Sequence, residues 1–297
     1  MKLTDFKALT FDVYGTLIDW ESGMVEGLKG LTARVGRDLS RDEILEAHAF
    51  HESTQQIQTP ARPYAELLAI VYKRLAEQWG VPVTLEECVA YGQSVGNWPA
   101  FEDSAGALQY LKKFYKLVIL SNVDNASFAA SNRRLQVTFD AIITAEDAGS
   151  YKPSPRNFEY MLQRLGAGLG GETIGKQQIL HTAESMFHDH KPANEFGLAS
   201  CWIYRRHKDQ GFGATMNPGT MPRVDFQFNS MADLVMPFYT TSLLPAGNAL
   251  EQNLVPVPSA CDSVPAPPLL PSPEQRRLDC KRHLHMNFYG IVLGTLG

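Results

Sequence analysis

Between residues 3 and about 238, the chain alternates short, continuous apolar runs with segments in which apolar residues recur at helical spacing. Continuous apolar runs are typical of strands that are buried on both faces, as in a parallel sheet. We expect helices at 104–114 and at 155–165. Strands that alternate with helices predict right-handed βαβ units. The pattern therefore predicts an α/β fold with a Rossmann-like, doubly wound parallel sheet, whose strands we expect at 8–11, 117–120, 141–143, 178–180, 200–204 and 225–228.

A second pattern interrupts the first between residues 22 and 98, where the sequence is mostly helical. Helices are expected at 25–35, 42–58, 64–79 and 85–95, separated by glycine and proline. A helical block placed after the first strand predicts an inserted cap subdomain at 22–98, with the core formed by 1–21 and 99–240. An elaborated crossover connection is the alternative interpretation.

Proline is unevenly distributed, and this marks a boundary. Of the 18 prolines, nine fall between Pro237 and Pro273. Proline at this density prevents regular secondary structure. We therefore expect residues 241–297 to form a disordered C-terminal tail.

Charge and composition narrow the classes of function. With 27 Lys and Arg against 32 Asp and Glu, the chain has no global excess of positive charge for a nucleic acid backbone. No run approaches the roughly 18 apolar residues of a membrane span, and the first residues lack a secretory signal. The four cysteines have no metal-binding or disulfide spacing. These features favour a cytoplasmic protein without nucleic acid or membrane partners. An exposed apolar cap helix would make a homodimer plausible.

Polar residues follow four of the expected strands. Asp12 follows the first, Ser121 and Asn122 the second, Lys152 the third after a loop, and Glu184 with Asp189 the fourth. The carboxyl ends of parallel strands meet at one crevice, where open α/β sheets bind their ligands. In such a crevice Asp12 could act as a nucleophile and form a covalent intermediate. Ser121 and a backbone amide could bind one anionic oxygen, while Lys152 could neutralise a second anionic group and keep Asp12 ionised.

The order of these motifs over roughly residues 6–237 resembles the haloacid dehalogenase superfamily, and the stretch from Asp12 to Thr16 is similar to its L-2-haloacid dehalogenase branch. Phosphatases of the superfamily place a second aspartate two residues after the nucleophile. Here that residue is Tyr14, whose ordinary pKa near ~10 argues against acid–base work at neutral pH.

The resemblance implies that Asp12 displaces halide from C2 of a 2-haloacid and that water then hydrolyses the aspartyl ester. Lys152, Ser121 and Asp189 would join Asp12 in catalysis. The side chains expected to bind the small anionic substrate or to orient Asp12 are Tyr14, Thr16, Asn122, Glu184, His48 and His51.

Two features depart from that branch. Its members draw an arginine from the second cap helix to hold the leaving halide, but this chain has no arginine between Arg41 and Arg62, so that His48 or His51 would have to substitute. Glu184 lies where the metal-dependent branch has an acidic ligand. Mg²⁺ bound by Asp12, Glu184 and Asp189 is therefore an alternative to a site without a cofactor.

Three functions remain open on the sequence. The first is hydrolytic dehalogenation of a short 2-haloacid by a hydrolase that acts on carbon–halide bonds. The second is a Mg²⁺-dependent phosphatase of the same superfamily, and the third is a biosynthetic or binding protein that does not use an Asp12 ester.

Overall fold

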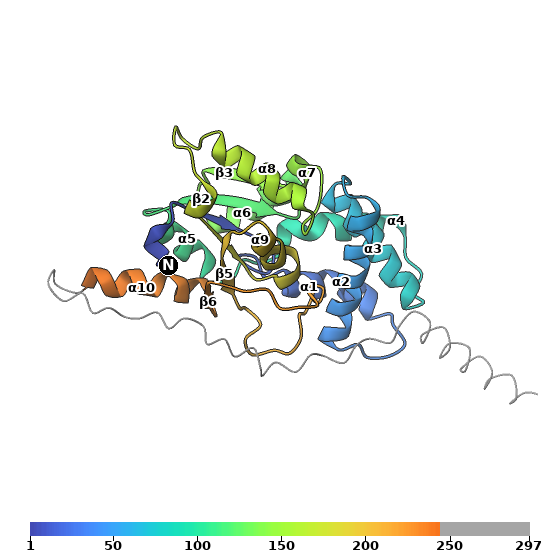
Figure 1. The fold of residues 1–297 in the computed structure, drawn as a ribbon. Helices are drawn as coiled ribbons and strands as arrows, with labels where there is room; N and C mark the ends of the chain where they lie inside the picture. Colours follow the sequence, from blue (N-terminus) through green and yellow to red (C-terminus); the bar gives the residue numbers. More distant parts are fainter. Residues whose placement is uncertain (244–297) are drawn as a thin grey trace, which may run out of the picture. The chain divides into compact units, whose positions relative to one another are not determined.

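Six parallel strands form one sheet in the computed structural model, which describes residues 1–243, with side chains through residue 238 (Figure 1). The predicted α/β fold with a parallel sheet is confirmed, and the strands appear in the order β3-β2-β1-β4-β5-β6. Their bounds are β1 (Ala8–Phe11), β2 (Lys116–Ser121), β3 (Ala141–Thr144), β4 (Ile179–Ala183), β5 (Ala199–Ile203) and β6 (Phe226–Phe228).

The central strands are continuous apolar runs because they are buried on both faces of the sheet. On β2, Leu117 and Ile119 belong to one buried cluster, while Val118 and Leu120 belong to the other. Every residue of β1 and β4 is buried. Both faces of the central strands are therefore covered, as the sequence predicted.

The order of the strands reverses at the centre of the sheet. Successive connections carry the chain from β1 to β2 and β3 on one side, and β4 then pairs with β1 on the other, with Phe11 opposite Thr182. Such a reversal opens a crevice at the carboxyl ends of the two strands, where α/β proteins place their ligands. Asp12 immediately follows β1 at this point.

Helices occupy most of the segment between β1 and β2 and gather beside the sheet (Figure 1). The four predicted helices are present, although the first begins at residue 20 rather than 25 because the Asp19 side chain accepts a hydrogen bond from Ser22 N and caps it. These helices, with a terminal 3₁₀ turn, are α1 (Trp20–Thr32), α2 (Arg41–Gln58), α3 (Tyr64–Gln78), α4 (Leu85–Gly92) and η2 (Gln93–Asn97), here called the helical block.

The chain enters and leaves the helical block through two segments that lie side by side. Asp19 N donates to Pro99 O, and Phe101 N donates to Leu17 O. Ile18 and Ala100 form an antiparallel bridge between the same segments. The block is therefore attached to the sheet through one narrow pair of linkers.

The remaining helices cover the sheet. Both predicted helices in this region are present, at α5 (Ser104–Leu111) and α8 (Pro155–Gly166). The others were not predicted: α6 (Asn125–Leu135), α7 (Ala145–Ala148), α9 (Lys191–Glu195) and α10 (Met231–Leu243), together with the short turns η1 (Leu3–Asp5), η3 (Lys176–Gln178) and the π-helical η4 (Met186–His190).

The tail expected at 241–297 lies outside the described residues from residue 244 onward, and its first three residues belong to helix α10. Within residues 1–243, no helix has both the length and the apolar character that crossing a membrane requires.

Candidate active site

The carboxylate of Asp12 is fixed by a tight turn at the end of β1. Gly15 adopts a φ of 95°, which favours glycine, and its N–H donates to Ile18 O. This turn brings Thr16 back toward the strand, where its hydroxyl donates to Asp12 Oδ2 at 2.8 Å. Glu184 N in turn donates to Thr16 Oγ1 at 2.9 Å. Thr16 therefore positions Asp12, which is 5% exposed.

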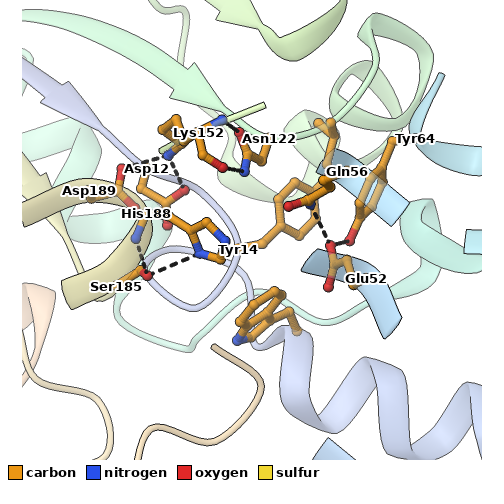
Figure 2. A pocket seen from close by; sticks show the side chains of 12 residues that line it. Asp12, Tyr14, Glu52, Gln56, Tyr64, Asn122, Lys152, Ser185, His188 and Asp189 are labelled. Carbon is orange, nitrogen blue, oxygen red and sulfur yellow. Dashed lines mark hydrogen bonds and ion pairs between the residues drawn. The ribbon is translucent and has the colours of Figure 1, made fainter. Parts of the chain in front are cut away.

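Lys152 connects the two acidic residues of the crevice. Its Nζ donates to Asp12 Oδ1 at 2.9 Å, to Asp189 Oδ1 at 2.6 Å and to Leu120 O at 2.9 Å, which uses all three ammonium hydrogens (Figure 2). Asn122 holds the backbone of Lys152 through both its amide nitrogen and its oxygen. Burial acts to lower the pKa of Lys152, but the opposing effect of the Asp12 and Asp189 carboxylates is larger. The pKa of Lys152 therefore lies above its ordinary value. The side chain is therefore a permanent cation.

Asp12 and Asp189 differ in acidity although they share Lys152. Burial raises the pKa of Asp12 above its ordinary value, and Lys152 limits that rise. Burial acts on Asp189 too, but Lys152 and His181 hold its pKa below the ordinary value. His181 Nε2 lies 2.9 Å from Asp189 Oδ1, and its Nδ1 lies 2.9 Å from Thr10 Oγ1. A proton taken up by this pair therefore resides on Asp12.

Two unpartnered acceptors border the same small cavity as Asp12. Asp189 Oδ2 and His188 Nε2 are buried and have no hydrogen-bond partner within residues 1–238. The cavity has a volume of about 20 Å³. A buried water needs about 10–15 Å³ and several polar partners. The cavity is therefore large enough for one water molecule, and Asp189 and His188 both line it.

The imidazole of His188 is oriented by neighbouring hydroxyl groups. Its Nδ1 lies 3.2 Å from Ser185 Oγ and 3.4 Å from Thr215 Oγ1, and its backbone N–H donates to Ser185 Oγ. Burial lowers the pKa of His188 to about 4, so that the ring is neutral near pH 7. If Nδ1 donates to Ser185, the lone pair of Nε2 is free to accept a proton.

The helical block contributes polar side chains to the other side of the cavity. Glu52 and Gln56 of α2 and Tyr64 of α3 line it, across the Tyr14 ring from Asp12 (Figure 2). Glu52 Oε1 accepts from the Tyr64 hydroxyl at 2.9 Å and from Gln56 Nε2 at 3.2 Å. Among the described lining residues, Lys152 is the single Lys or Arg.

Tyr14 lines the cavity as expected, but its hydroxyl is already paired. The Tyr14 hydroxyl lies 2.8 Å from Ser131 Oγ, and the ring packs edge-on against Trp98 with centroids 5.8 Å apart. Burial raises the pKa of Tyr14 well above its ordinary value. Tyr14 therefore acts here as a neutral wall of the cavity.

Five of the residues expected in the site do not line the cavity, and one of them, Thr16, instead holds Asp12 from outside the lining. His48 is buried behind Glu52, against Tyr91, and His51 turns toward Gln78 Oε1 at 2.7 Å. His48 lies on the same face of α2 as Glu52 and Gln56 but is fully buried, and neither histidine lines the cavity. Ser121 Oγ is buried without a partner among the described residues, and the carboxylate of Glu184 lies outside the lining.

The donors expected for Mg²⁺ do not converge. Lys152 Nζ occupies the position between Asp12 and Asp189, and burial raises the pKa of Glu184 to about 8, which keeps that carboxyl largely protonated at neutral pH. Within residues 1–243, no three histidine, cysteine, aspartate or glutamate side chains are arranged to hold a metal ion. His188 and His190 also diverge, since His190 Nε2 faces Ala183 O. The donor set therefore does not fit Mg²⁺, which the sequence left open as an alternative.

Sequence reasoning missed the contribution of α2 and α3. Glu52, Gln55 and Gln56 are buried polar residues on one side of α2. Polar residues in this spacing resemble an exposed helix face, so the apolar pattern alone hides them. The sequence did contain one indication: Glu52 and Gln56 follow His48 at intervals of four residues, so that all three lie on one face of the helix.

Comparisons with known proteins identify the family of the chain. A profile of haloacid dehalogenase-like hydrolases matches residues 6–177. The chain is 27% identical over 205 residues to an (S)-2-haloacid dehalogenase of Pseudomonas sp. strain YL, covering 67% of this chain and 83% of that protein. It is 28% identical over 240 residues to (S)-2-haloacid dehalogenase 4A of Burkholderia cepacia, covering 77% and 93%.

A solved structure shares the fold. The L-2-haloacid dehalogenase of Xanthobacter autotrophicus, with chloropropionic acid covalently bound, superimposes with a TM-score of 0.63 at 19% identity, covering 80% of this chain and 100% of that one.

Proposed function

The chain belongs to the haloacid dehalogenase-like hydrolases, and on that basis we propose that it hydrolyses the carbon–halogen bond of a short 2-haloacid through an ester on Asp12. The observation that carries this proposal is the fixed Asp12 carboxylate. Thr16 holds one oxygen and Lys152 the other, at the reversal point of the sheet. A buried carboxylate kept ionised by one ammonium suits nucleophilic attack.

The first step would form the ester. An oxygen of Asp12 attacks C2 of the substrate, the new C–O bond forms, and the carbon–halogen bond breaks with both its electrons leaving on the halide. The positive charge of Lys152 offsets the two carboxylates beside it, which lowers the cost of bringing an anionic substrate to Asp12.

The second step would hydrolyse the ester. A water oxygen attacks Cγ of Asp12, the bond between Cγ and the ester oxygen breaks, and a 2-hydroxyacid leaves. Asp189 Oδ2 and His188 Nε2 are suited to hold the two hydrogens of that water, because both are unpartnered acceptors of the same cavity. The neutral ring of His188 would accept a proton from the attacking water and pass it to the alkoxide oxygen that leaves Cγ, which gives the hydroxyl of the product.

Backbone amides are available for the carboxylate of the substrate. The N–H groups of Tyr14 and Asn122, two residues of the lining, donate to no acceptor among the described residues. The ammonium hydrogens of Lys152 are already used. Free amides at loop ends bind anions without a further cation. They would therefore bind the substrate carboxylate, a task for which the sequence suggested Lys152.

We also propose that residues 22–98 act as a cap. The cavity is lined from both sides, by Glu52, Gln56 and Tyr64 of the helical block and by Asp12 and Lys152 of the core. Closure of the block would exclude all water except the hydrolytic molecule.

Halide release from L-2-chloropropionate tests the proposal. We expect release by the wild-type protein, and its loss in Asp12→Asn with Asp5→Asn, an exposed aspartate, as the matched control. The absence of halide release from a panel of short 2-haloacids would contradict the proposal. Halide release that persists in Asp12→Asn would instead indicate that the reaction does not proceed through an ester on Asp12.

A further inference from the structure

Arg205 contacts the turn that follows Asp12, although it lies far from that turn in the sequence. It comes shortly after the end of β5, and its side chain is 11% exposed. Its Nε donates to Thr16 O at 3.1 Å, and its Nη2 donates to the same oxygen at 2.9 Å. Thr16 is fully buried, and no backbone N–H in the loops and turns of the described residues donates to its carbonyl. The guanidinium group therefore satisfies a buried carbonyl that the nearby backbone leaves without a donor.

Three further contacts fix the orientation of this guanidinium group. Nη1 and Nη2 of Arg205 donate to the two carboxylate oxygens of Asp103, each at 2.9 Å, and Cζ lies 4.0 Å from the centroid of the Phe101 ring. Asp103 is itself held by Ala232 N, which donates to Oδ2 at 3.1 Å. Burial acts to raise the pKa of Asp103, but Arg205 and the N–H of Ala232 hold it below its ordinary value. Arg205 is thus anchored by an ionised carboxylate.

Thr16 connects this anchored group to the nucleophile. The Thr16 hydroxyl donates to Asp12 Oδ2 at 2.8 Å and accepts from Glu184 N at 2.9 Å. The carbonyl that Arg205 holds belongs to the same residue, so a shift of the backbone at Thr16 would also move the hydroxyl. Removing Arg205 would leave the buried carbonyl without a donor, and a buried acceptor without a hydrogen bond is costly. The turn would therefore have to move to satisfy it.

We propose that Arg205 is a positioning residue for Asp12, which it serves by holding Thr16 so that the Thr16 hydroxyl fixes one carboxylate oxygen. The proposal rests on the proposed function, since Asp12 is taken to attack the substrate. Arginine suits this task because its planar fork donates to a carbonyl and to a carboxylate at once, whereas a lysine ammonium is a point charge on a flexible stem. Misplacing a reacting group by about 1 Å can cost about 100-fold in rate.

Steady-state kinetics with L-2-chloropropionate tests this role. We expect Arg205→Ala to lower kcat by about 10–100-fold. KM should change by less than about twofold, because Arg205 does not line the cavity. Arg205→Lys keeps the charge but not the fork, and its kcat should lie between those of Arg205→Ala and the wild-type protein. An unchanged kcat in a folded Arg205→Ala protein would overturn the proposal.

Added guanidinium separates positioning from a general effect on the fold. At a concentration too low to unfold the protein, guanidinium chloride should raise the kcat of Arg205→Ala by about three- to tenfold, because it can restore the hydrogen bonds to Thr16 O. Sodium chloride at the same ionic strength should not. An equal effect of the two salts on Arg205→Ala would overturn the proposal.

Arg34 provides the matched control, because its guanidinium group makes the same kinds of contact elsewhere. It donates to the carbonyl oxygens of Gly30 and Pro82 and to the carboxylate of Glu87, and none of these residues lines the cavity. Arg34→Ala should therefore keep the wild-type kcat, and guanidinium should not raise it. A loss of kcat in Arg34→Ala equal to that in Arg205→Ala would overturn the assignment to Thr16.

Hydrogen exchange at Glu184 gives an answer that does not depend on turnover. The amide N–H of Glu184 is bonded to Thr16 Oγ1, so a displaced Thr16 exposes it. We expect this amide to exchange about two- to twelvefold faster in Arg205→Ala, and at the wild-type rate in Arg34→Ala. Unchanged exchange in a folded Arg205→Ala protein would overturn the inference. Faster exchange at Glu184 together with absent halide release by the wild-type protein would contradict only the proposed function.

Discussion

At the scale of single residues, one ammonium group governs the site. Lys152 Nζ contacts Asp12 Oδ1 and Asp189 Oδ1, and His181 gives Asp189 a further partner that Asp12 lacks. The environment therefore separates the two carboxyl groups: Asp189 is the stronger acid, and the uptake of a proton falls on Asp12. Such a separation assigns different tasks to two neighbouring carboxyl groups.

The proposed formation of an ester should depend on pH through the pKa of Asp12. The nucleophile must be ionised, and burial raises its pKa above the ordinary 3.8. Activity should therefore be lost as the pH falls through a value higher than 3.8. The acid limb of kcat/KM measures this, because it reports the free enzyme before the ester exists. An acid limb with a midpoint at or below pH 3.8 would contradict this, because it would mean that Lys152 lowers the pKa of Asp12 by more than burial raises it.

His188 should matter for the second step and not for the first. His188→Gln removes the base but keeps a polar side chain, and loss of a general base typically slows a step by about 10²–10⁴-fold. The ester on Asp12 should then accumulate and appear as added mass in intact-protein mass spectrometry during turnover. The exposed His207→Gln is the control. A variant that turns over without accumulated ester would contradict the role of His188.

At the scale of elements, the turn after β1 determines where the carboxylate points. Gly15 has a φ of 95°, and a Cβ atom there would lie 3.0 Å from Trp20 Nε1. The turn leads directly into α1 and returns Thr16 to Asp12. A small change in the backbone at Gly15 would therefore move both the Asp12 carboxylate and the start of the helical block.

Gly15→Ala should consequently destabilise the protein by about 1–2 kcal/mol and reduce kcat. The matched control is Gly30→Ala in α1, where a Cβ atom meets no neighbour within 4 Å, so that alanine should stabilise the helix by roughly 0.5–1 kcal/mol. Urea unfolding of the two variants measures both effects. Equal free energies of unfolding would show that the turn tolerates a side chain.

The elements also show what the sequence could reveal. The strands were predictable because they are short, continuous apolar runs. The helices of the block were predictable because glycine and proline separate them. Helix α6 was missed because Phe128 and Leu135 are its only large apolar side chains, and α10 because Pro237 lies within it. Asp12, Lys152 and Asp189 were found because strand ends meet at one edge. Glu52 and Gln56 were not found, because the rotation of α2 about its axis is set by tertiary packing.

At the scale of the whole molecule, two hydrogen bonds join the helical block to the core near the cavity. Ala65 N donates to Asp124 Oδ2 at 3.0 Å, and the Tyr151 hydroxyl donates to Arg62 O. Other contacts also join the block to the core, since Arg134 donates to Gly96 O and Arg206 donates to Glu21 Oε2. If the block acts as the proposed cap, its opening has to break contacts of this kind.

Tyr151→Phe removes one of these bonds and keeps the ring. The net contribution of a hydrogen bond is about 0.5–1.5 kcal/mol, so the open form should gain about two- to twelvefold in population. Hydrogen exchange at the start of α3 should accelerate accordingly, while exchange in β2 stays unchanged. Unaltered exchange in α3 would indicate that the block is held closed by other contacts.

The central claim is that Asp12 forms an ester that water cleaves at its carbonyl carbon. A single turnover of a 2-haloacid by excess enzyme in H₂¹⁸O, followed by mass analysis of the peptide that contains Asp12, tests it most directly. The account predicts one ¹⁸O atom in the Asp12 carboxylate and ¹⁶O in the hydroxyl of the product. Label in the product hydroxyl with none in Asp12 would mean that water attacks the substrate directly, and would contradict the account.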